Sequence, residues 1–193
     1  MKFLHRPLKQ FIVNQKFGQN NACVDNATSR NVITCDGNNP PAGYRSLYGS
    51  VGHLGVDLAA YHGMEVYCIL DGVVDSIDTE LRSGLDMRIV SEYGGKKYRH
   101  IYEHLMGYQP KIGDRVRVGQ LVGWANNSGW SSGDHLHLQF EEWDGDTWIP
   151  IDPLPYMSDK FAKDILYTED KIRYLKEQIA ALAERIADFL RRR

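Results

Sequence analysis

The first 157 residues contain short apolar runs in which β-branched and aromatic residues are separated by Gly, Asn and Asp. Runs of this kind, bounded by turn residues, are typical of the strands of a β-sandwich or barrel. The glycines at 94 and 95 separate two runs and predict a tight hairpin. We predict strands at residues 11–14, 55–59, 65–70, 72–78, 86–93, 96–104, 121–125, 135–143 and 147–151.

The pattern changes after Pro155, and residues 158–193 contain neither Gly nor Pro. Apolar residues recur there at positions a and d of a heptad, which predicts one helix about 50 Å long. Isoleucine at a with leucine at d favours two strands in a self-associating coiled coil. Two interpretations stay open: dimerisation or attachment to a larger assembly, and a helix folded back on the β domain. The repeat comprises Ile165, Ile172, Ile179 and Ile186 at a, and Leu175, Leu182 and Phe189 at d.

These patterns predict a mainly β fold, an antiparallel β-sandwich followed by a C-terminal α-helix. At 193 residues the chain is long enough for one ordinary domain with an appendage. We expect the β domain to span residues 1–157 and the helix to span residues 158–193. Residues 20–50 are rich in Asn, Gly, Ser and Pro and predict a long surface loop inserted into the domain.

Net charge and hydropathy limit which classes of partner and which cellular locations the sequence favours. A net charge of −2 offers no basic surface for nucleic acid or for an anionic membrane. No apolar run reaches the roughly 18 residues that a membrane-spanning helix needs. The first ten residues are too polar for a signal peptide, so we expect a mature or trimmed form or export by another route.

The three cysteines do not form a CxxC pair, which argues against a structural thiolate zinc site. Cys23 and Cys35 flank the polar insertion, and both a disulfide and two free thiols are compatible with the sequence. Cys68 lies in an apolar run and is interpreted as a small core residue.

Histidines and one aspartate occur in three separated, mostly glycine-containing contexts. A catalytic zinc ion takes three protein ligands and keeps a fourth position open, and imidazole and carboxylate both suit it. Residues two apart on a strand share a face, so the two histidines of the His-Leu-His segment point the same way and the leucines beside them face the core. The set contains enough ligands for one zinc ion and two further histidines for chemistry: His53, Asp57, His104, His135 and His137.

The remaining histidines, His5, His62 and His100, are interpreted as surface or hydrogen-bonded core groups. No HExxH segment is present, so the helix-borne zinc protease arrangement does not apply. Glu103 precedes His104 and is a candidate general base. Because neighbours on a strand point to opposite faces, we expect only one of these two residues to face the metal.

Over residues 11–157 the chain resembles the lysostaphin/LytM-type zinc endopeptidases, which cut peptide bonds in bacterial peptidoglycan. The resemblance is carried by many short matches in the same order along the chain. They are Phe17-Gly18, Gly52-His53 through Asp57-Leu58, Gly63 to Val66, Asp71 to Val74, Tyr102 to Leu105, Ile112 to Gly123, Asn127 to Leu138 and Asp152-Pro153.

The resemblance implies the duplicated hybrid-motif fold and a site in a groove on the sheet. It implies one Zn²⁺ per chain bound by His53, Asp57 and His137, with His104 and His135 as the catalytic pair. It also implies a peptidoglycan hydrolase acting on peptide stems and crosslinks, located in the cell envelope, periplasmic or extracellular, or in a phage virion or lysin. Either catalytic histidine can take the proton of the attacking water while the other donates to the oxyanion.

Two departures from the family pattern bear on substrate preference. Asp134 precedes the His-Leu-His segment where the family usually has a small residue or proline, and the 20–50 insertion is long. Two other functions are compatible with parts of the sequence. One is a non-catalytic wall-binding or amidase-activating regulator, although such proteins typically lose zinc ligands. The other is a phosphocarrier or lipoyl carrier, suggested by the turn at residues 113–120.

Overall fold

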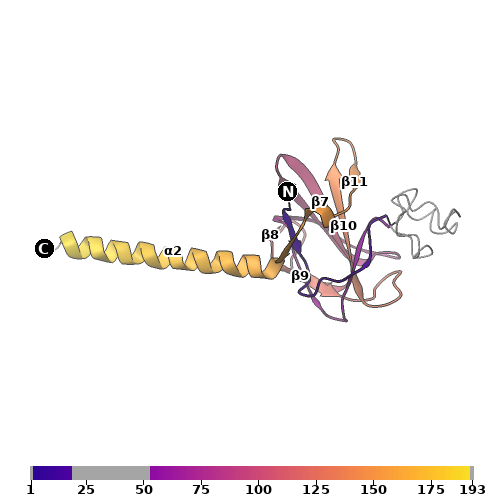
Figure 1. The fold of residues 1–193 in the computed structure, drawn as a ribbon, viewed down its shortest axis with the longest axis horizontal. Helices are drawn as coiled ribbons and strands as arrows, with labels where there is room; N and C mark the ends of the chain where they lie inside the picture. The colour runs from indigo at the N-terminus through magenta and orange to yellow at the C-terminus, as the bar shows by residue number, and fades with distance from the viewer. Residues whose placement is uncertain (1, 19–52, 192–193) are drawn as a thin grey trace.

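The computed structural model describes residues 2–18 and 53–191 of the chain (Figure 1). In these residues one large antiparallel sheet forms the body of the protein, and a single long α-helix leaves it (Figure 1). The elements are β1 (Leu4–Arg6), β2 (Val13–Gln15), β3 (Gly55–Ala59), β4 (Glu65–Tyr67), β5 (Gly72–Glu80), β6 (Gly84–Tyr93), β7 (Lys96–Tyr108), β8 (Arg115–Val116), β9 (Leu121–Ala125), β10 (His135–Trp143), β11 (Trp148–Pro150), η2 (Leu154–Tyr156), β12 (Met157–Phe161) and α2 (Ala162–Arg191).

The large sheet has the strand order β2-β3-β10-β7-β6-β5-β8, with β11 added beside β10. The long strand β7 passes a register shift near Leu105 and then pairs with β9, which in turn pairs with β4. All these pairs are antiparallel. The predicted fold class, mainly antiparallel β with a C-terminal helix, is confirmed.

The predicted strands at 55–59, 121–125 and 135–143 coincide with β3, β9 and β10. The prediction missed β1 and β8, which are too short for a periodic signal, and β12, whose three central residues are all polar. The hairpin predicted at the double glycine joins β6 to β7, with Tyr93 opposite Lys96. Both turn glycines have positive φ, 60° and 77°, as tight two-residue hairpins require.

The hydrophobic core lies against one face of the sheet. Side chains at alternate positions of the central strands contribute to it. On β10 the side chains of Leu136, Leu138 and Phe140 are fully buried, whereas His135 and His137, at the alternate positions, line the pocket on the other face. Apolar burial of this kind is the main driving force for folding. Cys68 is fully buried, as predicted, and burial raises the pKa of its thiol to about 12. Cys23 and Cys35 lie outside the described residues, as does the 20–50 insertion.

The C-terminal helix begins at Ala162, later than the predicted start at residue 158. Residues up to Phe161 instead form β12, which pairs in parallel with β1 near the N-terminus. Hydrogen bonds and ion pairs add to this pairing: His5 Nδ1 lies 2.9 Å from Ser158 Oγ, and Arg6 contacts Asp159 at 3.0 Å. The β part of the chain therefore extends past the predicted boundary at residue 157.

Only the first three turns of α2 contact the β domain, and the last of these contacts is that of Asp170 with Arg117. Ala162 is buried against Tyr67 and Val118, and Ile165 packs at the edge of this cluster. Beyond these turns the helix projects away from the sheet (Figure 1). The interpretation of a helix folded back along the domain is therefore wrong. Among the described residues no helix is long and apolar enough to cross a membrane.

Gly119 provides a test of how the domain holds the start of α2. Its φ is +80°, and a Cβ there would lie 2.2 Å from the carbonyl oxygen of Ala162. Gly113 has a similar φ of +87° with nothing near its Cβ position, so Gly113→Ala should cost only about 1–2 kcal/mol of backbone strain. We expect Gly119→Ala to lower the free energy of unfolding by clearly more, measured by urea denaturation. Equal losses in the two variants would contradict the close packing of α2 on this turn.

Candidate metal centre and active site

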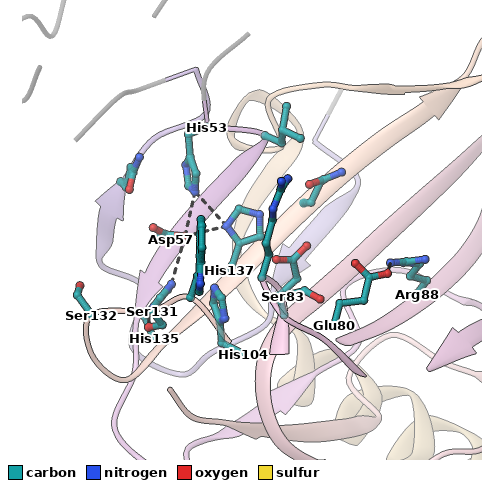
Figure 2. Close-up of a pocket in the computed structure, with 16 residues that line it drawn as sticks. His53, Asp57, Glu80, Ser83, Arg88, His104, Ser131, Ser132, His135 and His137 are labelled. Atoms are coloured by element: carbon teal, nitrogen blue, oxygen red, sulfur yellow. Dashed lines mark hydrogen bonds and ion pairs between the residues drawn. The ribbon is translucent and has the colours of Figure 1, made fainter. Parts of the chain in front are cut away.

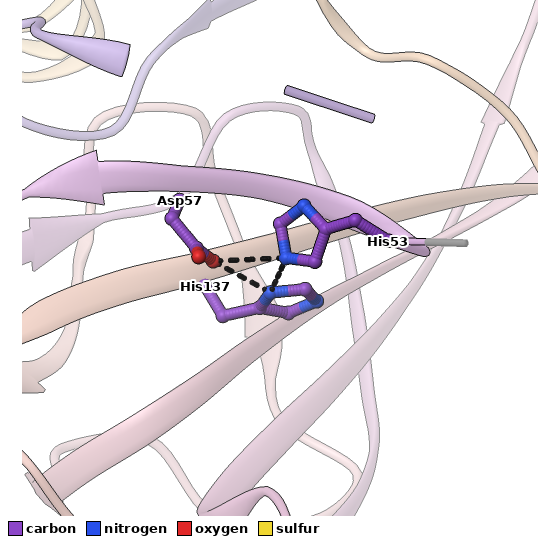
Figure 3. A group of neighbouring side chains, drawn as sticks. All are labelled: His53, Asp57 and His137. Carbon is purple, nitrogen blue, oxygen red and sulfur yellow. Dashed lines mark hydrogen bonds and ion pairs between the residues drawn. The ribbon is translucent and has the colours of Figure 1, made fainter. Parts of the chain in front are cut away.

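The site is built on the pairing of β3 with β10. In this antiparallel pair Asp57 lies opposite His137, so the two side chains emerge from adjacent strands on the same face. His53 lies on the segment that leads into β3 and reaches the same point. Three residues from two distant parts of the chain therefore converge, as Figure 3 shows.

Three ligand atoms form a small triangle (Figure 3). His53 Nε2 lies 3.0 Å from His137 Nδ1 and 3.1 Å from Asp57 Oδ1. His137 Nδ1 lies 2.9 Å from the same carboxylate oxygen. The candidate ligand atoms of these residues all lie within 4.8 Å of one another. Their side chains are almost fully enclosed, with exposures of 5%, 15% and 7% for His53, Asp57 and His137.

This donor set fits zinc. Two imidazole nitrogens and one carboxylate oxygen are the ligand types of catalytic zinc sites. With zinc–ligand bonds of about 2.0–2.1 Å, a tetrahedral centre has ligand atoms roughly 3.3 Å apart, so the triangle needs to widen by only a few tenths of an ångström. The three ligand atoms would therefore hold a zinc ion beside the pocket that the same residues line.

The electrostatics also favour a cation at this point. Burial alone would raise the pKa of Asp57, but hydrogen bonds from His137 and His53 outweigh it and hold that pKa well below its usual range. Burial lowers the pKa of His53, so its imidazole is readily neutral and available as a ligand. For His137, burial is outweighed by the carboxylates of Glu103 and Asp57, and its pKa is raised. The carboxylates around His137 therefore favour a positive charge at this position.

Backbone groups orient the ligands. The Nδ1–H of His53 donates to the carbonyl oxygen of Lys16 at 3.1 Å, which directs Nε2 toward the metal position. Gly55 lets β3 lie close to the second histidine ligand, because a Cβ there would come within 2.7 Å of His137 Nε2. A glycine inside a strand marks such close approaches, and this signal was available in the sequence. The Lys16 carbonyl was not predictable, because any residue supplies one.

The two candidate catalytic histidines, His104 and His135, lie next to each other beside the triangle (Figure 2). His104 Nδ1 donates to the carbonyl oxygen of Ser128 at 2.7 Å. His135 Nδ1 donates to the carbonyl oxygen of Gly133 at 2.8 Å and lies 3.0 Å from Ser131 Oγ. Neither contact involves Nε2, and His135 Nε2 lies 3.6 Å from Asp57 Oδ1. The rings of the two histidines are 4.6 Å apart, centre to centre.

His104 has a φ of +61°, the only positive value among the non-glycine residues described. Its backbone is held on both sides, because its N–H donates to Ser83 and its carbonyl accepts from Asn126, both at 2.8 Å. Such strain persists only where surrounding bonds enforce it, and it is common at functional sites. Burial, followed by the nearby His135, lowers the pKa of His104 to about 4, so its imidazole is neutral at neutral pH.

The left-handed backbone conformation of His104 makes the expectation that only one of Glu103 and His104 faces the site wrong. Both line the same pocket, because the irregular backbone at His104 breaks the strand alternation on which the expectation rested. Glu103 lies opposite His137 across the β7–β10 pair. Burial raises the pKa of its carboxyl group. Sequence reasoning therefore missed Glu103 as a pocket residue.

The pocket has a volume of about 350 Å³ and contains all five residues singled out from the sequence. Its far end is strongly charged: Arg88 contacts Asp78, Glu80 and Asp86 at 3.3–3.4 Å. Trp130, 59% exposed, stands at the rim. The pocket therefore presents polar and charged groups at one end and the histidines at the other.

The other histidines lie outside this pocket, as predicted. His100 is fully buried and contacts Ser91 Oγ and Tyr102 Oη at 2.9 Å, and burial lowers its pKa to about 3. His5 contacts Ser158. His62 is mostly exposed and lies 3.7 Å from Asp134. These residues are suitable controls for the site.

Comparison with known proteins identifies the family. The model of peptidase family M23 matches residues 51–153, which include all five site residues. The chain belongs to peptidase family M23. It is 34% identical over 106 residues to the glycyl-glycine endopeptidase ALE-1 of Staphylococcus capitis, covering 54% of this chain and 29% of that protein. It is 31% identical over 106 residues to lysostaphin of Staphylococcus simulans, covering 54% of this chain and 21% of that protein.

The structural likeness covers more of the chain than the sequence identity does. A zinc-containing peptidase from Vibrio cholerae superposes with a TM-score of 0.57 at 23% identity, covering 83% of this chain and 41% of that chain. The match to the two curated relatives spans less than a third of either protein. The shared part is therefore the M23 domain, which confirms the family suggested by the sequence motifs.

The ligand assignment predicts specific zinc binding. We expect the metal-free protein to take up one zinc per chain and to gain thermal stability, because zinc binds the folded state. His137→Ala should weaken zinc affinity at least about 100-fold, since even outer-shell partners contribute 10–100-fold. Isothermal titration calorimetry measures this, with His62→Ala as the control. Equal affinities for wild type and His137→Ala would contradict the assignment.

Proposed function

We propose that this chain is a zinc-dependent endopeptidase that hydrolyses peptide crosslinks of bacterial peptidoglycan. Membership of peptidase family M23 supports a peptidase, and the complete donor set supports zinc. One observation carries the proposal furthest: two further histidines, each fixed through Nδ1, present Nε2 beside the triangle. An arrangement built only to bind metal would not need them.

The proposed chemistry follows from this arrangement. When bound by His53, Asp57 and His137, zinc would supply a Lewis acid for the scissile carbonyl and lower the pKa of water in the site. His104 and His135 are the proposed catalytic pair. One Nε2 accepts the proton of the attacking water, and the other, when protonated, donates to the developing oxyanion. Because both Nδ1 atoms are tied to carbonyls, neither ring can turn away during the reaction.

The substrate and location follow from the relatives and stay part of the proposal. The name of ALE-1 specifies glycyl-glycine bonds for that protein. For this chain we propose peptide stems and crosslinks of the wall as substrate, and the cell envelope or a phage particle as the place of action. Asp134, close to His62, and Asp57 line a second, smaller pocket beside His135. An acidic group there favours substrates that carry a positive charge or N–H donors on that side.

The complete site also bears on the alternative functions. A non-catalytic regulator does not require His104 and His135 to be held in place beside a full ligand set. A phosphocarrier or lipoyl carrier does not require three ligands to converge within 4.8 Å. The peptidase is therefore the function that the geometry supports best.

Loss of either catalytic histidine should abolish hydrolysis without loss of metal. We expect His104→Ala and His135→Ala to lower the rate of wall-peptide release by about 10²–10⁴-fold, the usual contribution of a positioned acid or base. The readout is new amino termini released from walls with glycine bridges and from walls with D-alanyl crosslinks. Each variant should still bind one zinc, and His62→Ala should retain wild-type activity.

Removal of the metal distinguishes the proposed endopeptidase from a non-catalytic regulator. We expect a chelator to stop peptide release and stoichiometric zinc to restore it, because the histidines alone cannot polarise the carbonyl sufficiently. Mass spectrometry of the released fragments then identifies the bond. If the zinc-loaded wild type released no peptide ends from any type of wall, the endopeptidase proposal would fail.

A further inference from the structure

Alternate residues of β10 form a line of polar side chains that leads away from the metal centre. His137, Gln139 and Glu141 lie two apart, so their side chains emerge on the same face of the sheet. We call these three residues the polar line of β10. All three are buried. A buried polar group is costly unless it is hydrogen-bonded, so each member of the line needs a partner on this face.

The contacts at the outer end of the line fix the direction of its hydrogen bonds. Glu141 Oε2 accepts from Nε of Arg99 at 2.5 Å, and Glu141 Oε1 accepts from the amide Nε2 of Gln139 at 2.7 Å. An ionised carboxylate offers only acceptors, so it is the NH₂ group of Gln139 that must face it. The amide oxygen of Gln139 is therefore turned away from Glu141 and is available to a donor at the other end of the line.

Arg99 keeps Glu141 in this position. It lies directly opposite Glu141 in the β7–β10 pair. Its guanidinium lies over the ring of Trp148 on β11, 4.7 Å from the ring centre, and its side chain is only 20% exposed. A stacked guanidinium is already oriented, so it loses little freedom when it pairs with a carboxylate. The outer end of the polar line is therefore a fixed acceptor for the Gln139 amide.

The inner end of the line is the second ring nitrogen of His137. The Nδ1 atom of this residue belongs to the ligand triangle. A neutral imidazole that binds a metal ion through Nδ1 carries its one proton on Nε2, and that N–H requires an acceptor. Gly55 lies opposite Gln139 in the β3–β10 pair, and the absence of a side chain there leaves the space beside His137 Nε2 open.

The pKa of His137 supports a hydrogen bond to the Gln139 oxygen. Burial alone would lower this pKa, and the charge of Glu103 is the largest of the effects that raise it. A side-chain hydrogen bond with Gln139 is another of these effects. An amide oxygen raises the pKa of an imidazole by accepting its proton, whereas an amide NH₂ group does not. This agrees with the orientation of Gln139 that Glu141 requires.

We propose that Gln139 and Glu141 are positioning residues of the metal centre. Gln139 Oε1 accepts the Nε2–H of His137, and Glu141, held by Arg99, fixes the Gln139 amide in the orientation that this bond requires. The polar line keeps His137 in the tautomer that presents Nδ1 as a ligand. A hydrogen bond at the far nitrogen also makes a histidine a more basic ligand. The inference rests on the proposed zinc site and is independent of the reaction performed there.

The zinc affinity of the full chain tests the inference by isothermal titration calorimetry. We expect Gln139→Leu and Glu141→Gln each to weaken zinc binding about 10-fold or more, the usual effect of losing an outer-shell partner. Glu142→Gln is the matched control, because it removes the neighbouring carboxylate of the same strand, which forms an exposed ion pair with Lys96. The control should bind zinc within about twofold of wild type, since exposed ion pairs contribute little.

The possible failures are distinguishable. Unchanged affinity in both Gln139→Leu and Glu141→Gln would overturn the inference, as would equal weakening by Glu142→Gln. A wild type that binds no zinc would overturn the proposed zinc site together with the inference. Urea denaturation of the metal-free proteins verifies that each variant is folded.

Exchange of the two side chains separates a positioning role from a merely structural one. In Glu141→Gln a single amide oxygen faces two donors, the NH₂ of Gln139 and Arg99, so one hydrogen bond is lost whichever way the amides turn. Adding Gln139→Glu restores a complete set, because a carboxylate beside His137 accepts both its Nε2–H and the amide NH₂ from position 141. We expect the double variant to regain zinc affinity to within about threefold of wild type, since no donor is left unpaired. A double variant as weak as Glu141→Gln would overturn the proposal.

The tautomer of His137 is a direct readout. In proton–nitrogen NMR spectra of the zinc-loaded wild type we expect the ring proton of His137 on Nε2, in slow exchange with water. In Gln139→Leu this proton should exchange faster, because its acceptor is gone. A ring proton on Nδ1 of His137, or the same exchange rate in both proteins, would overturn the proposal.

Discussion

The structure depends on one strand pairing, that of β3 with β10. The register that puts Asp57 opposite His137 brings an aspartate from the first half of the chain to a histidine from the second half. A shift by one residue would turn the whole of β10 over, placing its leucines in the pocket and its histidines in the core. Burial of Leu136, Leu138 and Phe140 on the other face therefore enforces the geometry of the metal ligands.

Around this pairing, backbone groups do much of the positioning. The carbonyl oxygens of Lys16, Ser128 and Gly133 each accept from one histidine Nδ1 and so direct the Nε2 of that histidine into the site. The strained backbone of His104 belongs to the same scheme, since both its peptide groups are bonded to neighbouring segments. Substitution of surface side chains would leave these backbone contacts intact. A change in the irregular backbone of β7 at His104 would move that residue directly.

The sequence carried enough information for the fold class, and the five residues that it singled out lie around one pocket in the structure. Period-two alternation predicted β10, and with it the shared face of His135 and His137. The same rule failed at Glu103, because one left-handed residue breaks the alternation and no local signal marks it. It also missed β12, whose pairing with β1 joins the two ends of the β domain and cannot be inferred from either segment alone. Long-range pairings and backbone acceptors are thus the parts that the sequence does not reveal.

The central claim is that His53, Asp57 and His137 form one zinc centre with an open position. X-ray absorption at the zinc edge of the loaded protein tests it most directly. The account predicts a first shell of four nitrogen or oxygen atoms at about 2.0–2.2 Å, with outer-shell scattering from two imidazole rings. A shell containing sulfur, or one without imidazole scattering, would contradict the centre that this fold assembles.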